Sequence, residues 1–169
     1  RLSKHNINLR ETATFFDGLL KIDGNVNLLK QTVKNRPVPG GFYMNPLVGL
    51  YRFPRGMDLA EYKDHFEVWD DERQLNVQNW HAPTEDFEQN PYWVLERIRA
   101  RDQRTRVIAS VSMNLLLSNH ISIQARGSVD YLNDKFRQKF YASTAPALAG
   151  SNGRYIDASY EQTLTYGDV

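Results

Sequence analysis

The chain has 169 residues, a formal net charge of +1 at pH 7 and no cysteine, so disulfides and thiolate metal sites are excluded. The near-neutral charge gives no global field that would attract nucleic acid or an anionic membrane surface. No run of about 20 apolar residues is present, which excludes transmembrane helices. A mean hydropathy of −0.58 still permits transmembrane strands, because one face of such strands is polar.

The first two predicted strands, residues 6–16 and 19–33, alternate apolar and polar side chains and are joined by a short turn at Asp17 and Gly18. The apolar face of the second run is formed by Leu20, Ile22, Gly24, Val26 and Leu28. Glu11 interrupts the apolar face of the first run. This predicts either a position near a lipid headgroup boundary or a β-bulge that shifts the alternation.

Two further strands are predicted at residues 105–117 and 120–135, on either side of the sequence SNH. Their apolar positions are Val107, Ala109, Val111, Met113 and Leu115, then Ile121, Ile123, Ala125, Gly127, Val129 and Tyr131. Tilted membrane strands need about 9–11 residues to cross a bilayer, whereas globular strands more often have about 5–6. The length of these runs therefore favours membrane strands.

Long connections at residues 34–104 and 140–162 follow the second and fourth predicted strands. Short turns that alternate with long loops are typical of outer-membrane barrels, and so long a loop is uncommon in a compact soluble domain. We therefore expect an all-β fold, an antiparallel transmembrane β-barrel segment of about four strands. The alternative is a soluble antiparallel sheet with one wet face, as in a secreted β-sandwich carbohydrate-binding module. The chain starts and ends in mid-pattern, as expected of an internal piece of a longer protein.

Several segments carry a resemblance to a known family. In chain order they are NRPVPGGFYMNPLVGLYRFPRG, VQNW, NPYW, DQRTRVIASVSMNLLL, SIQARGSVDYLNDKF, YASTAPALAGSNGRYI and TYGD. This set resembles the SusC/RagA family of TonB-dependent outer-membrane transporters of Bacteroidetes. The resemblance implies a barrel of about 22 strands closed around a plug domain, and that plug is absent from this chain.

The resemblance also implies a function and a set of partners. The family takes up nutrients, importing oligosaccharides or peptides across the bacterial outer membrane. Its members work with a SusD-like surface lipoprotein and are driven by the TonB complex through the plug region. For this segment we therefore expect contact with the rest of the barrel, the plug and outer-membrane lipid, and no nucleic acid.

The polar faces of the predicted strands should point into the barrel lumen, where they meet the plug or water and where opposite charges can pair. The lumen-facing candidates are Lys21, Asp23, Asn25, Arg126 and Asp130. A Lys or Arg on the opposite, lipid-facing side would cost about 2–4 kcal/mol near the bilayer midplane.

Aromatic residues in the first long loop are candidates for contact with substrate or with the lipoprotein. These are Tyr51, Trp69, Trp80, Tyr92 and Trp93. The competing roles are packing inside the loop and a place in the interfacial aromatic girdle. Trp80 and Trp93 are the best candidates for loop packing or partner contact.

No motif predicts catalysis, a cofactor or a metal. The four histidines are scattered, HExxH is absent, and no serine lies in a nucleophile-elbow context. A glycoside hydrolase fragment would need two carboxylates that converge in a cleft. We therefore expect no enzyme activity.

Overall fold

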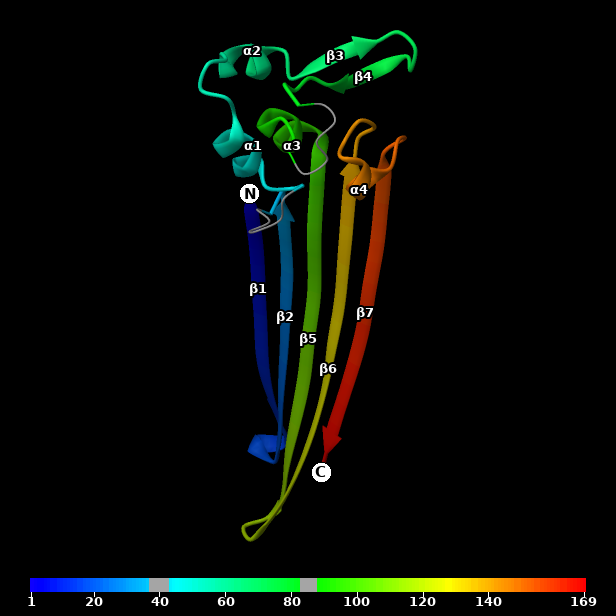
Figure 1. Ribbon diagram of the computed structural model, residues 1–169. Coiled ribbons are helices and arrows are strands. Elements are labelled where there is room, and N and C mark those ends of the chain that lie inside the picture. Colours follow the sequence, from blue (N-terminus) through cyan, green and yellow to red (C-terminus); the bar gives the residue numbers. More distant parts are fainter. Residues whose placement is uncertain (37–42, 83–87) are drawn as a thin grey trace. The chain divides into compact units, whose positions relative to one another are not determined.

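The computed structural model describes residues 1–36, 43–82 and 88–169, and within them the protein is mostly β with antiparallel sheets. The main sheet has the strand order β1-β2-β5-β6-β7 (Figure 1). Its strands are β1 (Leu2–Phe15), β2 (Leu20–Lys34), β5 (Ile98–Ser118), β6 (Ile121–Phe140) and β7 (Arg154–Asp168). A second sheet pairs β3 (Glu67–Asp70) with β4 (Leu75–Gln78). The helices are α1 (Pro46–Arg52), α2 (Leu59–Asp64), α3 (Pro91–Arg97) and α4 (Pro146–Ala149), with a 3-10 turn η1 (Phe16–Gly18).

The all-β antiparallel prediction is confirmed, but two of its details are wrong. The main sheet has five strands rather than about four. The loop bounds also differ, because β5 begins at Ile98, inside the predicted loop 34–104, and β7 begins at Arg154, inside the predicted loop 140–162. The sequence of β7, RYIDASYEQTLTYGD, mixes Tyr, Ile and Leu with acids and small polar residues, which weakens the period-two signal. Its Tyr, Ile and Thr residues nevertheless favour a strand.

The chain divides into two compact units. The first, here called the lobe, comprises Arg1 and residues 34–101 and 136–157. The second, here called the sheet unit, comprises residues 2–33, 102–135 and 158–169. Among the described residues, no helix combines the length and the apolar character that crossing a membrane requires.

In the sheet unit, the register of β1 and β2 sorts side chains by polarity. The two strands pair without interruption from Leu2 opposite Val33 to Phe15 opposite Leu20. Opposed residues of an antiparallel pair project from the same face. The apolar pairs are Ile7–Leu28, Leu9–Val26 and Ala13–Ile22, and the polar pairs are Asn8–Asn27, Arg10–Asn25 and Thr12–Asp23. One face of this hairpin is therefore apolar and the other polar, as the alternation predicted.

The uninterrupted register also decides the alternatives for Glu11. A β-bulge in β1 would place two residues opposite one, and the pairing contains no such step. The bulge alternative is therefore wrong. Glu11 lies directly opposite Gly24, on the apolar face between Leu9 and Ala13.

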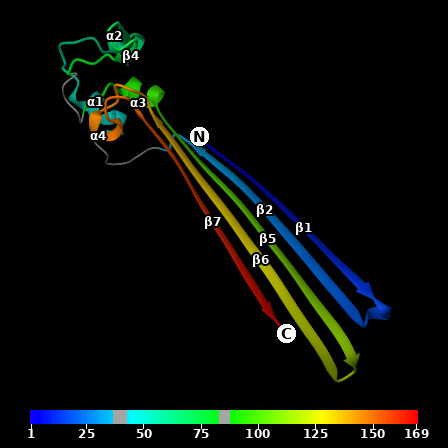
Figure 2. The ribbon, with the colours of Figure 1, turned by 90° about the vertical axis from the view of Figure 1, so that its right-hand side faces the viewer.

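The two predicted short turns are confirmed, and they lie at the same end of the sheet unit (Figures 1 and 2). The first turn contains η1, where Phe16, Asp17 and Gly18 all have positive φ. The second contains Asn119 and His120 between β5 and β6. The segments that connect β2 to β5 and β6 to β7 belong to the lobe.

Burial separates the two units. Every buried residue that the structure describes belongs to the lobe. In the sheet unit, by contrast, Leu9, Val111 and Ile121 on the apolar face are 62%, 52% and 57% exposed. The lobe is thus a small globule with a core, while both faces of the sheet unit are open.

Two helices of the lobe begin at an Asn-Pro pair. The Oδ1 atom of Asn45 accepts a hydrogen bond from the Leu47 N–H at 3.0 Å, and Pro46 occupies the first turn of α1. Asn90 and Pro91 start α3 in the same way. An Asn cap satisfies a free N–H of the first turn, and Pro at the first helical position loses nothing because its missing N–H has no partner there.

The lobe core forms where α3 meets the ends of β5 and β6 and the helix α4. Its buried members are Val94, Ile98, Phe140 and Ala149, with Met44, Leu148 and Ile156 packed against them. The long connection predicted at 34–104 therefore contains helices, a hairpin and part of a core. Its residues 37–42 and 83–87 lie outside the described part of the chain.

Gly49 sets how closely α1 approaches the segment before α3. A Cβ atom at this buried position would collide with the carbonyl oxygen of Gln89. Ala normally stabilises a helix by about 1 kcal/mol relative to Gly, but overpacking costs about 1–3 kcal/mol. We therefore expect Gly49→Ala to destabilise the lobe, measured as faster amide hydrogen exchange. Gly56→Ala is the control, because nothing lies within 4 Å of its Cβ position; equal exchange in both variants would contradict the prediction.

Candidate functional site: a charge-paired sheet face and an aromatic lobe

The polar face of the sheet unit carries charge pairs that cross between neighbouring strands. On the first hairpin, a single Asp23 oxygen accepts hydrogen bonds from Arg10 Nε at 3.1 Å, Arg10 Nη2 at 2.9 Å and Thr12 Oγ1 at 2.7 Å. Arg10 and Thr12 belong to β1 and Asp23 to β2. The charge of the Asp23 carboxylate is thus balanced by a residue of the same sheet.

Two further pairs join β5 to β6. Arg106 binds Asp130 through Nε at 2.9 Å and Nη2 at 2.5 Å, and Arg104 binds Asp134 through the same two nitrogens at 2.8 and 2.7 Å. Bidentate pairs of this kind fix both side chains in orientation. Residues two apart on a strand share a face, so both pairs line the same side of the sheet unit.

The predicted lumen-facing set is distributed over this polar surface. Asp23 and Asp130 are held in the pairs just described, and Arg126 Nε lies 3.6 Å from Asp168 Oδ1. Asn25 lies opposite Arg10, and its Oδ1 atom has no hydrogen-bond partner among the described residues. Lys21 is exposed and lies opposite Thr14.

Sequence reasoning missed the arginine partners Arg10, Arg104 and Arg106. A signal was present for Arg106, because the short turn at SNH pairs β5 with β6 and places their polar side chains opposite each other. The pair Arg104–Asp134 lies closer to the far ends of the strands, where DQRTR and LNDKF carry few apolar residues. The charge pair helps to hold the strands together where apolar alternation has ended.

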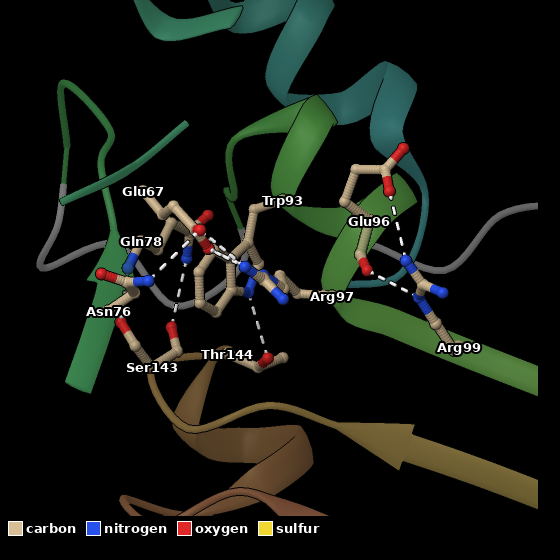
Figure 3. Close-up of polar contacts among 9 residues, drawn as sticks. All are labelled: Glu67, Asn76, Gln78, Trp93, Glu96, Arg97, Arg99, Ser143 and Thr144. Atoms are coloured by element: carbon tan, nitrogen blue, oxygen red, sulfur yellow. Dashed lines mark hydrogen bonds and ion pairs between the residues drawn. The ribbon is translucent and has the colours of Figure 1, made fainter. Parts of the chain in front are cut away.

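In the lobe, Arg97 contacts two segments that are distant from it in sequence, and Figure 3 shows its contact with Glu67. Its guanidinium donates from Nε to Glu67 Oε2 at 2.7 Å and from Nη2 to Glu67 Oε1 at 2.6 Å. The ring centroids of Tyr141 and Phe66 lie 4.9 and 5.9 Å from its central carbon. The hydrogen bonds with Glu67 raise the pKa of Arg97 above its usual value, so the cation is fixed.

Asn90 is the polar centre of the lobe and is fully buried. Its side-chain nitrogen donates to the carbonyl oxygens of Tyr62 and Asn79, both at 2.8 Å. Its side-chain oxygen accepts from the Tyr92 N–H at 2.9 Å, and its own N–H donates to Gln78 Oε1 at 2.6 Å. Because the amide is satisfied on all sides, it joins α2, β4 and α3 at one point.

An aromatic cluster surrounds a second buried group, the carboxylate of Glu88. The ring of Trp80 lies 5.4 Å from Phe53, 5.4 Å from Tyr62 and 4.7 Å from His81, measured between centroids. Glu88 accepts from Trp80 Nε1 at 3.3 Å, and its oxygens lie 3.0 Å from Arg52 Nε and 2.8 Å from His81 Nε2. A buried carboxylate is costly unless it is paired; Arg52 supplies the opposite charge and Trp80 a hydrogen bond.

The structure divides the predicted aromatic candidates. Trp93 and Trp80 are 1% and 5% exposed, so they pack inside the lobe and present no surface to a ligand. The indole N–H of Trp93 donates to Thr144 Oγ1 at 3.1 Å (Figure 3). Tyr92 is half-buried, whereas Trp69 and Tyr51 are 56% and 84% exposed and remain available for contact.

Comparison with known proteins gives no further assignment. No protein-family model matches the chain, and no curated protein matches it. Within the described ranges, no group of three or more His, Asp or Glu residues is arranged to hold a metal ion. The function must therefore be argued from the geometry of the sheet unit and the lobe.

Proposed function

We propose that the chain is a segment of a SusC-like TonB-dependent importer of the bacterial outer membrane, which takes up oligosaccharides or peptides together with a SusD-like lipoprotein. The observation that carries this proposal is the uninterrupted β1–β2 register, which sorts the side chains into an apolar and a polar face. The exposure of Leu9, Val111 and Ile121 on the apolar face supports contact with lipid.

The length of the apolar rows also supports a membrane wall. On β5, every second residue from Val107 to Leu117 is apolar. Ten steps of about 3.3 Å span about 33 Å along the strand. With the 35–45° tilt of barrel strands, that length corresponds to a height of about 25 Å, the height of the apolar band of outer-membrane barrels.

The paired charges of the polar face fit a lumen filled by water or a plug. Arg10, Arg104 and Arg106 are each matched by an aspartate on the neighbouring strand. Such a surface is hydrophilic but carries little net field, so it can contact a mobile plug without holding it by charge. The mechanism we propose is binding and gated passage. Substrate is captured between the loops and the lipoprotein cap, and the plug then rearranges under the action of the TonB complex.

The alternative of a secreted β-sandwich carbohydrate-binding module has less support. A sandwich buries one face of each sheet against the other at a spacing of about 10 Å. Apart from the main sheet, the described residues form a two-stranded sheet with four residues in each strand. So small a sheet could not cover the apolar rows of β1, β2, β5 and β6.

Membrane fractionation tests the proposal directly. We expect the full-length protein to sediment with the outer membrane, to resist extraction by alkaline carbonate and to be released by detergent. We also expect that loss of the gene removes uptake of one class of oligosaccharide or peptide. Recovery of the folded protein in a detergent-free soluble fraction would contradict the proposal and favour the sandwich module.

A further inference from the structure

A row of cations crosses the strand ends on one side of the lobe. The Lys34 N–H donates to the carbonyl oxygen of Arg1 at 2.8 Å, so these two residues lie opposite each other. The Asn35 N–H donates to the Ala100 oxygen at 2.9 Å, and β2 lies beside β5 in the sheet. Because antiparallel neighbours advance in opposite directions, the next opposed pair is Lys34 and Arg101. Opposed residues project from the same face, so Arg1, Lys34 and Arg101 form one row.

The pairing of β5 with β6 extends this row to a further strand. The Tyr141 N–H donates to the carbonyl oxygen of Arg97 at 3.3 Å. Counting from that bond, four residues forward along the chain and four residues back, Arg101 lies opposite Arg137. Arg137 in turn donates from Nε to Asp157 Oδ2 at 3.1 Å, so the row ends at an acid on β7.

A second opposed pair, Arg99 and Lys139, lies beside the row by the same count. Arg99 is paired with Glu96, with Nη2 and Oε2 3.4 Å apart, and Lys139 Nζ lies 5.8 Å from the centroid of the Tyr155 ring. The two pairs together define what is here called the cationic face, whose exposed members are Arg1, Lys34, Arg99, Arg101, Arg137 and Lys139.

The alternate residues of these strands point the other way, into the lobe. Ile98, Gln138 and Phe140 are buried, whereas Arg137 and Lys139 between and beside them are exposed. The cationic face is therefore the outer surface of the strand ends, and the lobe core lies behind it.

The charges of this face are not balanced within the protein. Arg99 and Arg137 have acid partners, but within the described part of the chain Arg1, Lys34 and Lys139 form no ion pair, and neither does Arg101. Like charges directly opposite each other destabilise a sheet. The row repeats that arrangement from strand to strand, so an anion that bridges the cations would remove a repulsion as well as form new contacts.

We propose that the cationic face binds the phosphate groups of lipopolysaccharide in the outer leaflet of the bacterial outer membrane. Arg and Lys donate charge-assisted hydrogen bonds to phosphate oxygens. A flat row spread over neighbouring strands suits a layer of anionic headgroups better than one small anion. The inference rests on the proposed importer function, in which the apolar row of β5 faces lipid, and it names the lipid that meets the wall where that row ends.

The position of Arg101 in β5 favours a lipid with a large phosphorylated saccharide. β5 runs without interruption from Ile98 to Ser118, and Arg101 stands six residues before Val107, where the apolar row begins. Six residues rise about 20 Å along a strand, or about 15 Å along the bilayer normal at a tilt of 35–45°. The headgroup layer of an ordinary bilayer is only about 5–8 Å thick on each side. Phosphorylated sugars of lipopolysaccharide extend beyond that layer.

The test is a titration of the full-length protein in detergent with lipopolysaccharide and with the same lipopolysaccharide after removal of its phosphates. We expect the phosphorylated form to bind roughly tenfold more tightly, with an affinity that falls as salt is added. Exchanging two cations that lack an acid partner, Lys34→Gln with Arg101→Gln, should weaken binding of the phosphorylated form roughly tenfold, since each exposed charge pair contributes modestly.

Two further variants serve as controls. Lys34→Arg with Arg101→Lys keeps both charges and should retain binding. Arg55→Gln with Lys63→Gln removes two exposed cations of the lobe that lie outside the cationic face, and it should leave binding unchanged. A loss of binding in this last variant equal to that of the Lys34 and Arg101 exchange would show that only the total charge matters, and the inference would be wrong.

Phosphatidylglycerol and inorganic phosphate are the comparison anions, and both should bind more weakly than lipopolysaccharide. Equal affinity for phosphatidylglycerol or for the dephosphorylated form would overturn the inference. So would unchanged lipopolysaccharide binding together with loss of the SusD-like lipoprotein in the glutamine variant, since the face would then bind an acidic protein surface. Failure of lipopolysaccharide to bind a protein that fractionates with the outer membrane overturns only this inference. Lipopolysaccharide binding by a protein that is soluble without detergent overturns only the importer proposal.

Discussion

Val111→Arg is expected to lower the free energy of unfolding of the protein in a lipid bilayer by about 2–4 kcal/mol, the cost of an arginine facing lipid near the midplane. Val111 lies near the middle of the apolar row of β5, and its Cγ1 atom is 4.0 Å from the Cβ position of Gly127 on the neighbouring strand. The row of β5 to which it belongs is apolar at every second residue from Val107 to Leu117. The measurement is a denaturant titration of the protein refolded into vesicles.

Ser112→Arg is the matched control, because consecutive residues of a strand project from opposite faces. This variant adds the same charge and nearly the same bulk on the polar face, where Arg104 and Arg106 already lie. We expect it to change the unfolding free energy by less than about 1 kcal/mol. Equal losses in the two variants would show that the two faces do not meet different solvents, and the proposed membrane wall would be untenable.

Asn90→Asp is expected to destabilise the lobe by about 3 kcal/mol or more, although the two side chains have nearly the same shape. The change replaces two donated hydrogen bonds with a carboxylate oxygen that faces the carbonyl oxygens of Tyr62 and Asn79. It also places a charge at a position with no exposed surface. Native-state hydrogen exchange of the lobe amides measures the loss.

Asn45→Asp provides the comparison, because this residue also caps a helix but makes its capping hydrogen bond through the side-chain oxygen. A carboxylate accepts the Leu47 N–H equally well, and a negative charge at a helix N-terminus is favourable. We expect this variant to be as stable as the parent or slightly more so. If Asn90→Asp were equally well tolerated, the role of Asn90 as the polar centre of the lobe would be wrong.

The sheet could be predicted from the sequence where the alternation is strong. The runs around Val26 and Val111 have a clear period of two, and the turns at Asp17 and at His120 are short. The strands, the two hairpin pairings and the division into an apolar and a polar face could therefore be predicted. The ends of β5 and β6 could not be predicted, because charged residues there break the alternation. Those ends are held together by contacts such as Arg104–Asp134. Such a contact forms only when the two strands are already paired, so it leaves no local signal in the sequence.

Part of the lobe was also readable and was missed. The two Asn-Pro pairs at Asn45 and Asn90 are helix-start signals, since Asn favours the cap and Pro the first turn. The remaining contacts had no local signal. Arg97 meets Glu67, and Lys139 meets Tyr155, only because the chain returns from a distance. Nor does the spacing of Trp80 and Trp93 reveal that both are buried while Trp69 is exposed.

The position of Glu11 opposite Gly24 has a consequence for how the hairpin assembles. A shift of β1 by one residue would move its apolar side chains to the polar face of the sheet. A shift by two residues would keep each side chain on its face but place Glu11 opposite Ile22 or Val26. The three hydrogen bonds that Asp23 accepts would then be lost. The hydrogen bonds that Arg10 and Thr12 donate to Asp23 thus belong to one alignment of the two strands. A fixed register matters most for a sheet that assembles in hydrocarbon, because misaligned backbone groups there find no water to hydrogen-bond.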